Sequence, residues 1–169
     1  LYWQHNTEGS SRQTEAKLEL TIGNNTPVIH DLIFGSSYST NMETTKIVDI
    51  SEFTLTTGVE IKVLMAYANT SENIKLNVNK TGNIAVKLSG DNVYYWDANS
   101  IVTFSYDGSN WLLIDCAVEG SATSYRIDTS EYPEGTTLKW RVKTAGVVEN
   151  ENGYMYSDWS VGRTVVIYA

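Results

Sequence analysis

The side chains able to act as nucleophiles or general bases are few and stand in no catalytic pattern. The chain contains two histidines, His5 and His30, and one cysteine, Cys116. No Gly-x-Ser-x-Gly elbow is present, and neither histidine stands at a spacing typical of a Cys-His pair. Cys116 directly follows an apolar segment, so we expect it to be a small buried hydrophobic side chain. We therefore predict no catalytic residue and a protein that is not an enzyme.

Carboxylates are numerous but scattered. Asp and Glu contribute 20 residues, yet no pair stands in a setting that would make one an acid and the other a base. Asp91, Asp97, Asp107 and Asp115 could suggest calcium, but the EF-hand spacing and the nonapeptide calcium repeat are absent. Asp107 precedes Gly108 and is typical of a turn residue whose side chain bonds its own backbone. We predict no metal site and no cofactor.

One segment has the chemistry of carbohydrate recognition. Residues 91–99 place Tyr94, Tyr95 and Trp96 between Asp and Asn residues. Exposed aromatic faces mark binding surfaces, and Asn and Asp side chains can hydrogen-bond sugar hydroxyls. Successive strand residues point to opposite faces, so we expect Tyr95 on one face and Tyr94 and Trp96 on the other, with one of these sets in the core. Tyr94, Tyr95 and Trp96 are the candidate ligand-binding residues.

The acidic charge of the chain excludes some partners. Twenty acidic residues against twelve basic ones give a net charge of −8, which repels phosphate backbones and anionic lipid surfaces. We therefore expect no nucleic-acid partner. No stretch approaches the roughly 18 consecutive apolar residues that a membrane span requires, so we expect no membrane insertion. A single cysteine cannot form an internal disulfide, so the fold must depend on packing and backbone pairing.

Hydrophobic alternation and turn residues predict an all-β chain. Tyr, Trp, Thr and Val are plentiful, which favours strands over helices. Residues 16–22 and 138–143 alternate between apolar and polar side chains, as half-buried strands do. Residues 101–106 and 111–114 flank an Asp-Gly-Ser-Asn turn and predict a β-hairpin. Residues 93–96 form a further strand candidate.

The segment 138–143 also carries a pattern that predicts a structural role. Alternation places Trp140 on the inner face, which leaves a row of cationic side chains on the outer face. Two aromatic residues further along the chain can lie across that row, so that cations and rings stack alternately, at about 0.5–1 kcal/mol for each contact. The predicted cation–aromatic ladder consists of Lys139, Arg141, Lys143, Tyr156 and Trp159.

The two ends of the chain resemble halves of one fibronectin type III domain. Tyr156-Ser157-Asp158-Trp159-Ser160 is similar to the Trp-Ser-x-Trp-Ser variant of that family, and Trp3 matches its early core tryptophan. Residues 1–31 and 121–169 together supply about 80 residues, somewhat short of the ~100 of an immunoglobulin-like sandwich. The resemblance implies one discontinuous sandwich, interrupted at a loop by residues 32–120. Such insertions are tolerated because loop-closure entropy grows slowly with length.

Residues 32–120 resemble a β module of tail fibres and other tail-tip proteins in phages and prophages that infect Gram-positive bacteria. The resemblance rests on an ordered set of segments, which are residues 34–40, 46–48, 53–58, 68–70, 76–82 and 102–113. It implies a virion-surface role in host attachment or in building the tail tip. It transfers no individual binding residue.

We therefore expect an all-β protein in which a fibronectin type III-like β-sandwich carries an inserted small β-sandwich or barrel module. The expected function is non-catalytic: a phage tail module that displays residues 32–120 for attachment to the host surface, with cell-wall glycan as the expected ligand, or for tail-tip assembly. The expected partners are a host polysaccharide or receptor, neighbouring tail proteins and, by resemblance, further copies in a full-length trimer. The expected location is the virion.

Two other classes of function stay open. The first is a bacterial extracellular adhesin, or a carbohydrate-binding accessory module of a secreted protein, since fibronectin type III-like units occur there too. The second is a structural spacer that binds no cell-wall material.

Overall fold

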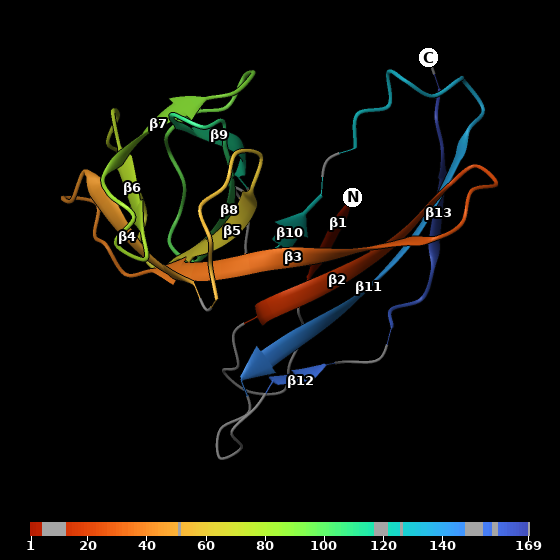
Figure 1. Ribbon diagram of the computed structural model, residues 1–169, viewed down its shortest axis with the longest axis horizontal. Helices are drawn as coiled ribbons and strands as arrows, with labels where there is room; N and C mark the ends of the chain where they lie inside the picture. The colour runs from red at the N-terminus through yellow and green to blue at the C-terminus, as the bar shows by residue number, and fades with distance from the viewer. Residues whose placement is uncertain are drawn as a thin grey trace. The chain divides into compact units, whose positions relative to one another are not determined.

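The computed structural model describes residues 1–4, 13–50, 52–116, 122–125, 127–147, 154–156 and 159–168. These residues form thirteen strands and no helix, which confirms the predicted all-β fold class. In this described part, no helix is long and apolar enough to cross a membrane. The strands (Figure 1) are β1 (Tyr2–Gln4), β2 (Gln13–Ile22), β3 (Val28–Ser37), β4 (Thr45–Ile50), β5 (Glu60–Met65), β6 (Lys75–Val78), β7 (Ile84–Leu88), β8 (Ser100–Tyr106), β9 (Trp111–Cys116), β10 (Ala122–Ser124), β11 (Thr137–Val147), β12 (Tyr154–Tyr156) and β13 (Arg163–Val166).

The chain divides into two compact units. The sheet unit consists of Leu1, Trp3–Leu32 and Tyr125–Ala169, and the barrel unit consists of Tyr2 and Ile33–Ser124. The sheet unit therefore joins both ends of the chain, and the barrel unit is built from the middle. Strand β3 runs from the first unit into the second.

The barrel unit is a closed ring of seven strands, in the order β3-β4-β6-β7-β9-β8-β5 and back to β3 (Figure 1). Three of the pairings in this ring are parallel: β3 with β5, β4 with β6, and β7 with β9. Each parallel pair joins strands that are not consecutive in the chain. Closure leaves no strand of the ring with a free edge, because each strand pairs with a neighbour on both sides.

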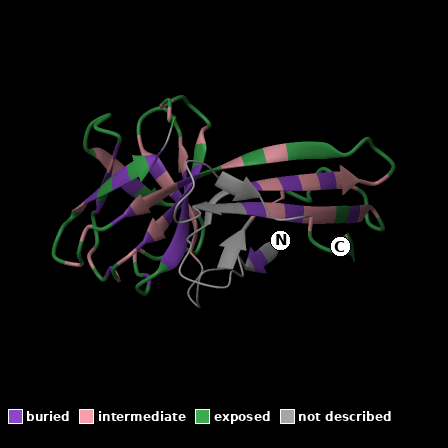
Figure 2. Ribbon diagram, turned by 90° about the horizontal axis from the view of Figure 1, so that it is seen from below, coloured by how far each residue is buried: buried purple, intermediate pink, exposed green. Residues whose placement is uncertain are grey.

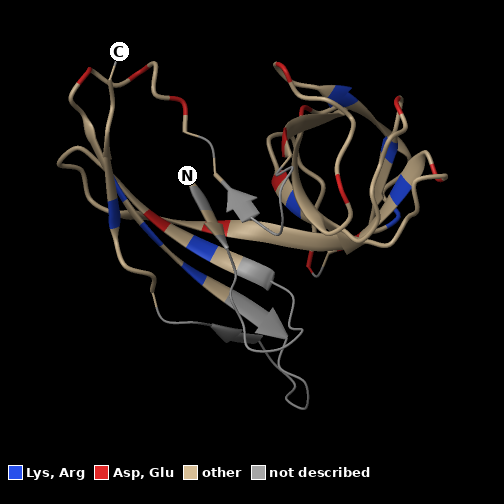
Figure 3. Cartoon of the chain, turned by 180° about the vertical axis from the view of Figure 1, so that it is seen from behind, with Lys and Arg blue, Asp and Glu red and all other residues tan. Residues whose placement is uncertain are grey.

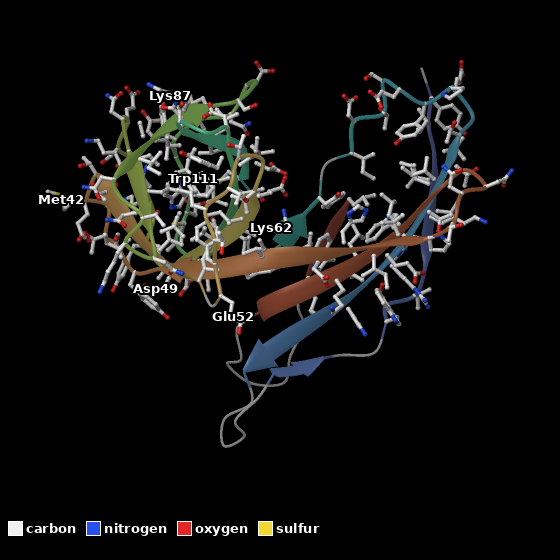
Figure 4. The ribbon with its side chains drawn as sticks, in the orientation of Figure 1. Met42, Asp49, Glu52, Lys62, Lys87 and Trp111 are labelled. Carbon is white, nitrogen blue, oxygen red and sulfur yellow. The ribbon has the colours of Figure 1, made fainter. Side chains whose placement is uncertain are left out.

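Alternating apolar side chains fill the barrel. In β4, Val48 and Ile50 are buried, whereas Ile47 and Asp49, which alternate with them, are exposed. Figure 2 shows the same alternation of buried and exposed bands along the barrel strands. Trp111, the first residue of β9, is fully buried in this core (Figure 4). Each large apolar side chain that is fully buried contributes about 1.5–3 kcal/mol, so the core holds the strands firmly.

The hairpin predicted for residues 101–106 and 111–114 is confirmed by the antiparallel pairing of β8 with β9. Its turn is fixed by Asp107, whose Oδ1 accepts hydrogen bonds from the backbone N–H groups of Ser109 (2.7 Å) and Asn110 (2.6 Å). Gly108 has a φ of 101°, a conformation that residues with a Cβ rarely adopt. These backbone hydrogen bonds favour the carboxylate and lower the pKa of Asp107.

The strand predicted for residues 93–96 is wrong. This segment is irregular apart from one isolated antiparallel bridge between Asn69 and Trp96. The backbone N–H of each residue donates to the carbonyl of the other, at 2.9 and 3.1 Å. Residues 93–96 are thus held by packing and by this single bridge, and not by the hydrogen bonds of a regular strand.

The sheet unit is organised around β2 and β11. These strands pair antiparallel from Leu138 opposite Ile22 onward, and β12 and β13 pair with the other edge of β11. The buried Leu18 and Leu20 of β2 lie opposite Val142 and Trp140 respectively. On the predicted inner face of residues 138–143, Leu138 and Val142 are buried, whereas Trp140 is only half-buried. Trp3 and Trp140 both belong to this unit. Its resemblance to a fibronectin type III sandwich stays a prediction.

Candidate binding surface at one end of the barrel

Strand directions bring three long connections together at one end of the barrel. Ser37, the last residue of β3, lies opposite Met65, the last residue of β5, and Met65 lies opposite Ser100, the first residue of β8. The first residues of β4 and β6, Thr45 and Lys75, are also in register. The connections between β3 and β4, between β5 and β6, and between β7 and β8 therefore emerge at the same end. We call this the loop end, and it consists of residues 38–44, 66–74 and 89–99.

Side-chain hydrogen bonds tie the first of these loops to the second. The Asn41 Oδ1 atom accepts from the backbone N–H of Thr70 (2.7 Å) and from its Oγ1 (3.0 Å). The Asn41 carbonyl accepts from the Ser71 hydroxyl at 3.1 Å. The first loop is also tied to the barrel, since Lys46 Nζ donates to the Thr40 carbonyl at 2.8 Å.

The second loop is tied to the third in the same way. The Asn69 Nδ2 atom donates to the Tyr94 carbonyl at 2.7 Å, in addition to the backbone bridge between Asn69 and Trp96. The indole N–H of Trp96 donates to the Tyr67 carbonyl at 3.2 Å. The loop end is therefore held in one arrangement, and a preorganised surface loses little entropy when it binds a ligand.

The three candidate ligand-binding residues do different things. Trp96 is only 3% exposed and belongs to the barrel core, so it offers no ring face to a ligand. Tyr94 packs against the same core, and its hydroxyl donates to the Val86 carbonyl at 3.2 Å. Tyr95 is 46% exposed. Trp96 and Tyr94 are thus structural residues, and of the three only Tyr95 presents its ring to solvent.

Other exposed apolar side chains of the loop end were missed by sequence reasoning. Tyr38, Met42, Tyr67 and Val93 are all exposed, and Figure 4 shows Met42 projecting away from the barrel. Each lies in a connection that leaves or enters a barrel strand. The sequence signal was the position of Tyr38 and Tyr67 just after strands β3 and β5, but only the parallel pairing of these two strands places both tyrosines at one end.

Tyr95 and Glu72 form a pair across two loops. The Tyr95 hydroxyl donates to Glu72 Oε1 at 3.1 Å. This hydrogen bond, together with the negative charge of Glu72, raises the pKa of Tyr95. The phenol is neutral at ordinary pH, as an unperturbed tyrosine also is, and the hydrogen bond holds its ring beside a carboxylate.

The loops of this end are acidic. They contain four carboxylates, which are Glu43, Glu72, Asp91 and Asp97, and no Lys or Arg. Figure 3 shows a similar division over the barrel unit, with most acidic residues in the loops and most lysines on strands. Three lysines lie within two residues of these loops, Lys46, Lys75 and Lys87, and of these Lys46 is buried with its Nζ atom against the Thr40 carbonyl. Burial lowers the pKa of Lys46, and the charge of Glu43 partly opposes this.

The residues considered for catalysis form no active site in the described part of the chain. Burial, together with the charges of Asp115 and Asp97, raises the pKa of Cys116 to about 11, so the thiol is protonated and unreactive at neutral pH. His30 lies against Tyr125, with 3.4 Å between Nδ1 and the tyrosine hydroxyl. His5 is outside the described residues.

Nor does a metal centre form there. Among the described residues, no group of three or more His, Cys, Asp or Glu side chains is placed to hold a metal ion. Asp107, one of the acidic residues considered for calcium, is engaged with the backbone of its own turn.

The outer face of the sheet unit carries the predicted cationic row. The Trp159 ring lies 4.7 Å from the Arg141 guanidinium carbon and 4.9 Å from Lys143 Nζ. Arg141 also binds Glu19 on β2 with two hydrogen bonds, of 2.8 and 3.1 Å. Trp159 therefore bridges two cations of β11, and Arg141 joins β11 to β2. Lys139 is exposed, and the Tyr156 side chain lies outside the described residues.

Comparisons with known proteins found no matching family model, no matching curated protein and no matching solved structure. Function is therefore inferred from the residues and geometry of the chain itself.

Proposed function

We propose that this chain is a non-catalytic adhesion module of a phage tail, and that its barrel unit binds a host-surface glycan through the loop end. The observation that carries this proposal is the set of exposed tyrosines on the loop end, Tyr38, Tyr67 and Tyr95. Each presents a flat apolar ring with a polar edge, which suits the stacking of a sugar ring and the hydrogen bonding of its hydroxyls.

The rigidity of the loops supports the same function. Glycan binding by exposed side chains gains little energy per contact, so affinity depends on surfaces that are ordered before the ligand arrives. The hydrogen bonds of Asn41 and Asn69 provide that order across all three loops. A polar hollow in the sheet unit, lined by Gly23, Asn24 and Thr136 among others, contains no aromatic ring and offers no comparable platform.

The phage assignment is supported by the resemblance of residues 32–120 to tail-fibre modules. The alternative assignments are a bacterial surface adhesin, a carbohydrate-binding accessory module and a structural spacer. The first two would use the same loop end, whereas the spacer would bind no wall material.

Binding to cells and purified walls tests the proposal. We expect the fluorescently labelled full chain to bind some Gram-positive cells and wall polysaccharides saturably. We expect the Tyr67→Ala/Tyr95→Ala variant to lose about 1–2 kcal/mol of binding free energy, because two exposed rings that can stack on a sugar are removed. Tyr168→Ala is the matched control, because Tyr168 is an exposed tyrosine of the sheet unit. Absence of binding over a broad panel would identify a spacer, and equal binding by all variants would place the site elsewhere.

A further inference from the structure

The charge of the loop end selects among glycans. The four carboxylates of its loops stand without a Lys or Arg in the same segments. Exposed carboxylates repel a polyanion and attract a polycation, and tyrosine rings attract cations through their negative faces. The tyrosine rings and the carboxylates therefore both favour a positively charged ligand.

The lysines at the adjoining strand ends do not reverse this balance. In β6, Leu76 and Val78 are buried, so Lys75 points to the outer wall of the barrel. In β7 the buried residue is Val86, so Lys87 also points outward. Counting Lys46, Lys75 and Lys87 at +3 and Asp115 at −1 with the loop charge of −4 still leaves a net charge of −2.

The pair of Tyr95 and Glu72 provides a recognition element for an ammonium group. The phenol hydroxyl lies 3.1 Å from Glu72 Oε1, and both side chains are exposed. An ammonium group placed over the Tyr95 ring near its hydroxyl would contact an aromatic face and a carboxylate together. A phosphate or a sugar carboxylate in the same place would meet only repulsion from Glu72.

We infer that the glycan bound at the loop end carries free amino groups, as a de-N-acetylated hexosamine polymer does, and is not an anionic wall polymer. This inference rests on the proposed function, because it names the ligand class of the same surface. The exposed tyrosines provide stacking, and Glu72 with the other loop carboxylates provides charge complementarity.

Calorimetric titration of the full chain with three defined probes tests the inference. The probes are a glucosamine oligomer, its N-acetylated counterpart and polyglycerol phosphate, each at low salt and at 0.5 M salt. We expect the glucosamine oligomer to bind best and to weaken with salt, since screening acts on exposed charges. We expect Glu72→Gln and Tyr95→Ala each to weaken it by about two- to fivefold.

Matched controls isolate the two contributions. Glu72→Gln keeps an acceptor for the Tyr95 hydroxyl and removes only the charge. Asp49→Asn removes the same charge from the outer wall of β4, outside the loops that form the loop end (Figure 4), and should leave binding unchanged. A thermal unfolding curve for each variant establishes that the fold is kept.

Each other outcome overturns the inference. Preference for the N-acetylated oligomer, or no effect of Glu72→Gln, would overturn the amino-group inference while glycan binding stands. Preference for polyglycerol phosphate would do the same. Failure of all three probes would overturn it as well, and the cell-binding assay then decides separately whether the proposed adhesion function holds.

Discussion

We expect the Lys62→Met variant to be more stable than the wild-type chain. Lys62 lies on β5 between the inward-facing Ile61 and Val63, so its side chain belongs to the outer wall of the barrel, yet it is only 2% exposed. Its Nζ atom donates to Glu60 Oε1 at 3.3 Å and to Thr103 Oγ1 at 3.1 Å. A charged group is thus buried with only one carboxylate in direct contact among the described residues.

The expected change in the free energy of unfolding is the difference between the cost of burying the Lys62 charge and the interactions that offset it. Burying an ammonium group costs several kcal/mol. The Glu60 side chain is 41% exposed, so its ion pair with Lys62 returns about 1 kcal/mol or less. The hydrogen bond to Thr103 returns about 1.5–3 kcal/mol. Methionine keeps most of the volume without the charge, and we expect a net gain of about 1–2 kcal/mol, or several degrees in the melting temperature of a unit of this size.

The same argument predicts a pH dependence. Burial lowers the pKa of Lys62 from its ordinary value of 10.5, an effect that outweighs the opposite influence of Glu60 and Asp115. Between the lowered pKa and 10.5 the unfolded chain holds a proton that the folded chain has released, so wild-type stability rises with pH in this window. That gain is lost as pH falls through the lowered pKa. Lys62→Met should lack this rise.

Calorimetry at pH 7 and at steps up to pH 10.5 measures the stability gained by Lys62→Met and the rise of wild-type stability with pH. Amide exchange of β5 and β8 shows whether these changes arise in the barrel unit. Lys87→Met is the control, because Lys87 is exposed on β7 (Figure 4) and should change stability by no more than about 0.5 kcal/mol. The reasoning would be refuted if Lys62→Met lost more than about 1 kcal/mol at pH 7 while Lys87→Met did not, because the ion pair with Glu60 would then outweigh the burial cost.

Three further predictions concern single side chains. Trp96→Ala should destabilise the barrel by about 3–5 kcal/mol in urea unfolding, whereas Tyr95→Ala should stay within about 0.5 kcal/mol of wild type, because only the first creates a core cavity. Trp159→Ala should cost about 1–2 kcal/mol through its two cation contacts, and calorimetry showing no loss would contradict the ladder. Cys116 should alkylate slowly at pH 8 and faster only as pH approaches about 11, the raised pKa of its thiol, and rapid labelling at pH 8 would contradict that pKa.

Local patterns predicted much of the secondary structure. The alternation in residues 138–143 and the turn at Asp107 and Gly108 each depend on neighbouring residues in the chain, so they were visible in the sequence. The boundaries predicted for the inserted segment, residues 32–120, lie close to those of the barrel unit, Ile33–Ser124. The strand predicted at residues 93–96 failed because apolar residues in a loop can be buried without any strand ladder.

The candidate site was only partly predictable. The segment containing Tyr94, Tyr95 and Trp96 was identified from its composition, but composition alone could not decide which rings are exposed. The partner of Tyr95 comes from another loop, because a hydrogen bond holds Glu72 beside it. The position of Tyr95 beside Glu72 therefore depends on contacts between loops that are far apart in the sequence.

By itself, the sequence determined the all-β class, the inner faces of several strands, one hairpin and the acidic charge of the loops. These properties follow from side-chain types and from their spacing along the chain. Tertiary structure alone decided that seven strands close into a barrel, since three of the pairings are parallel and join strands that are distant in sequence. Closure also decided that Trp96 is buried, that Lys62 is buried on the outer wall, and that the exposed tyrosines share one end of the barrel, because burial and proximity are properties of packed strands.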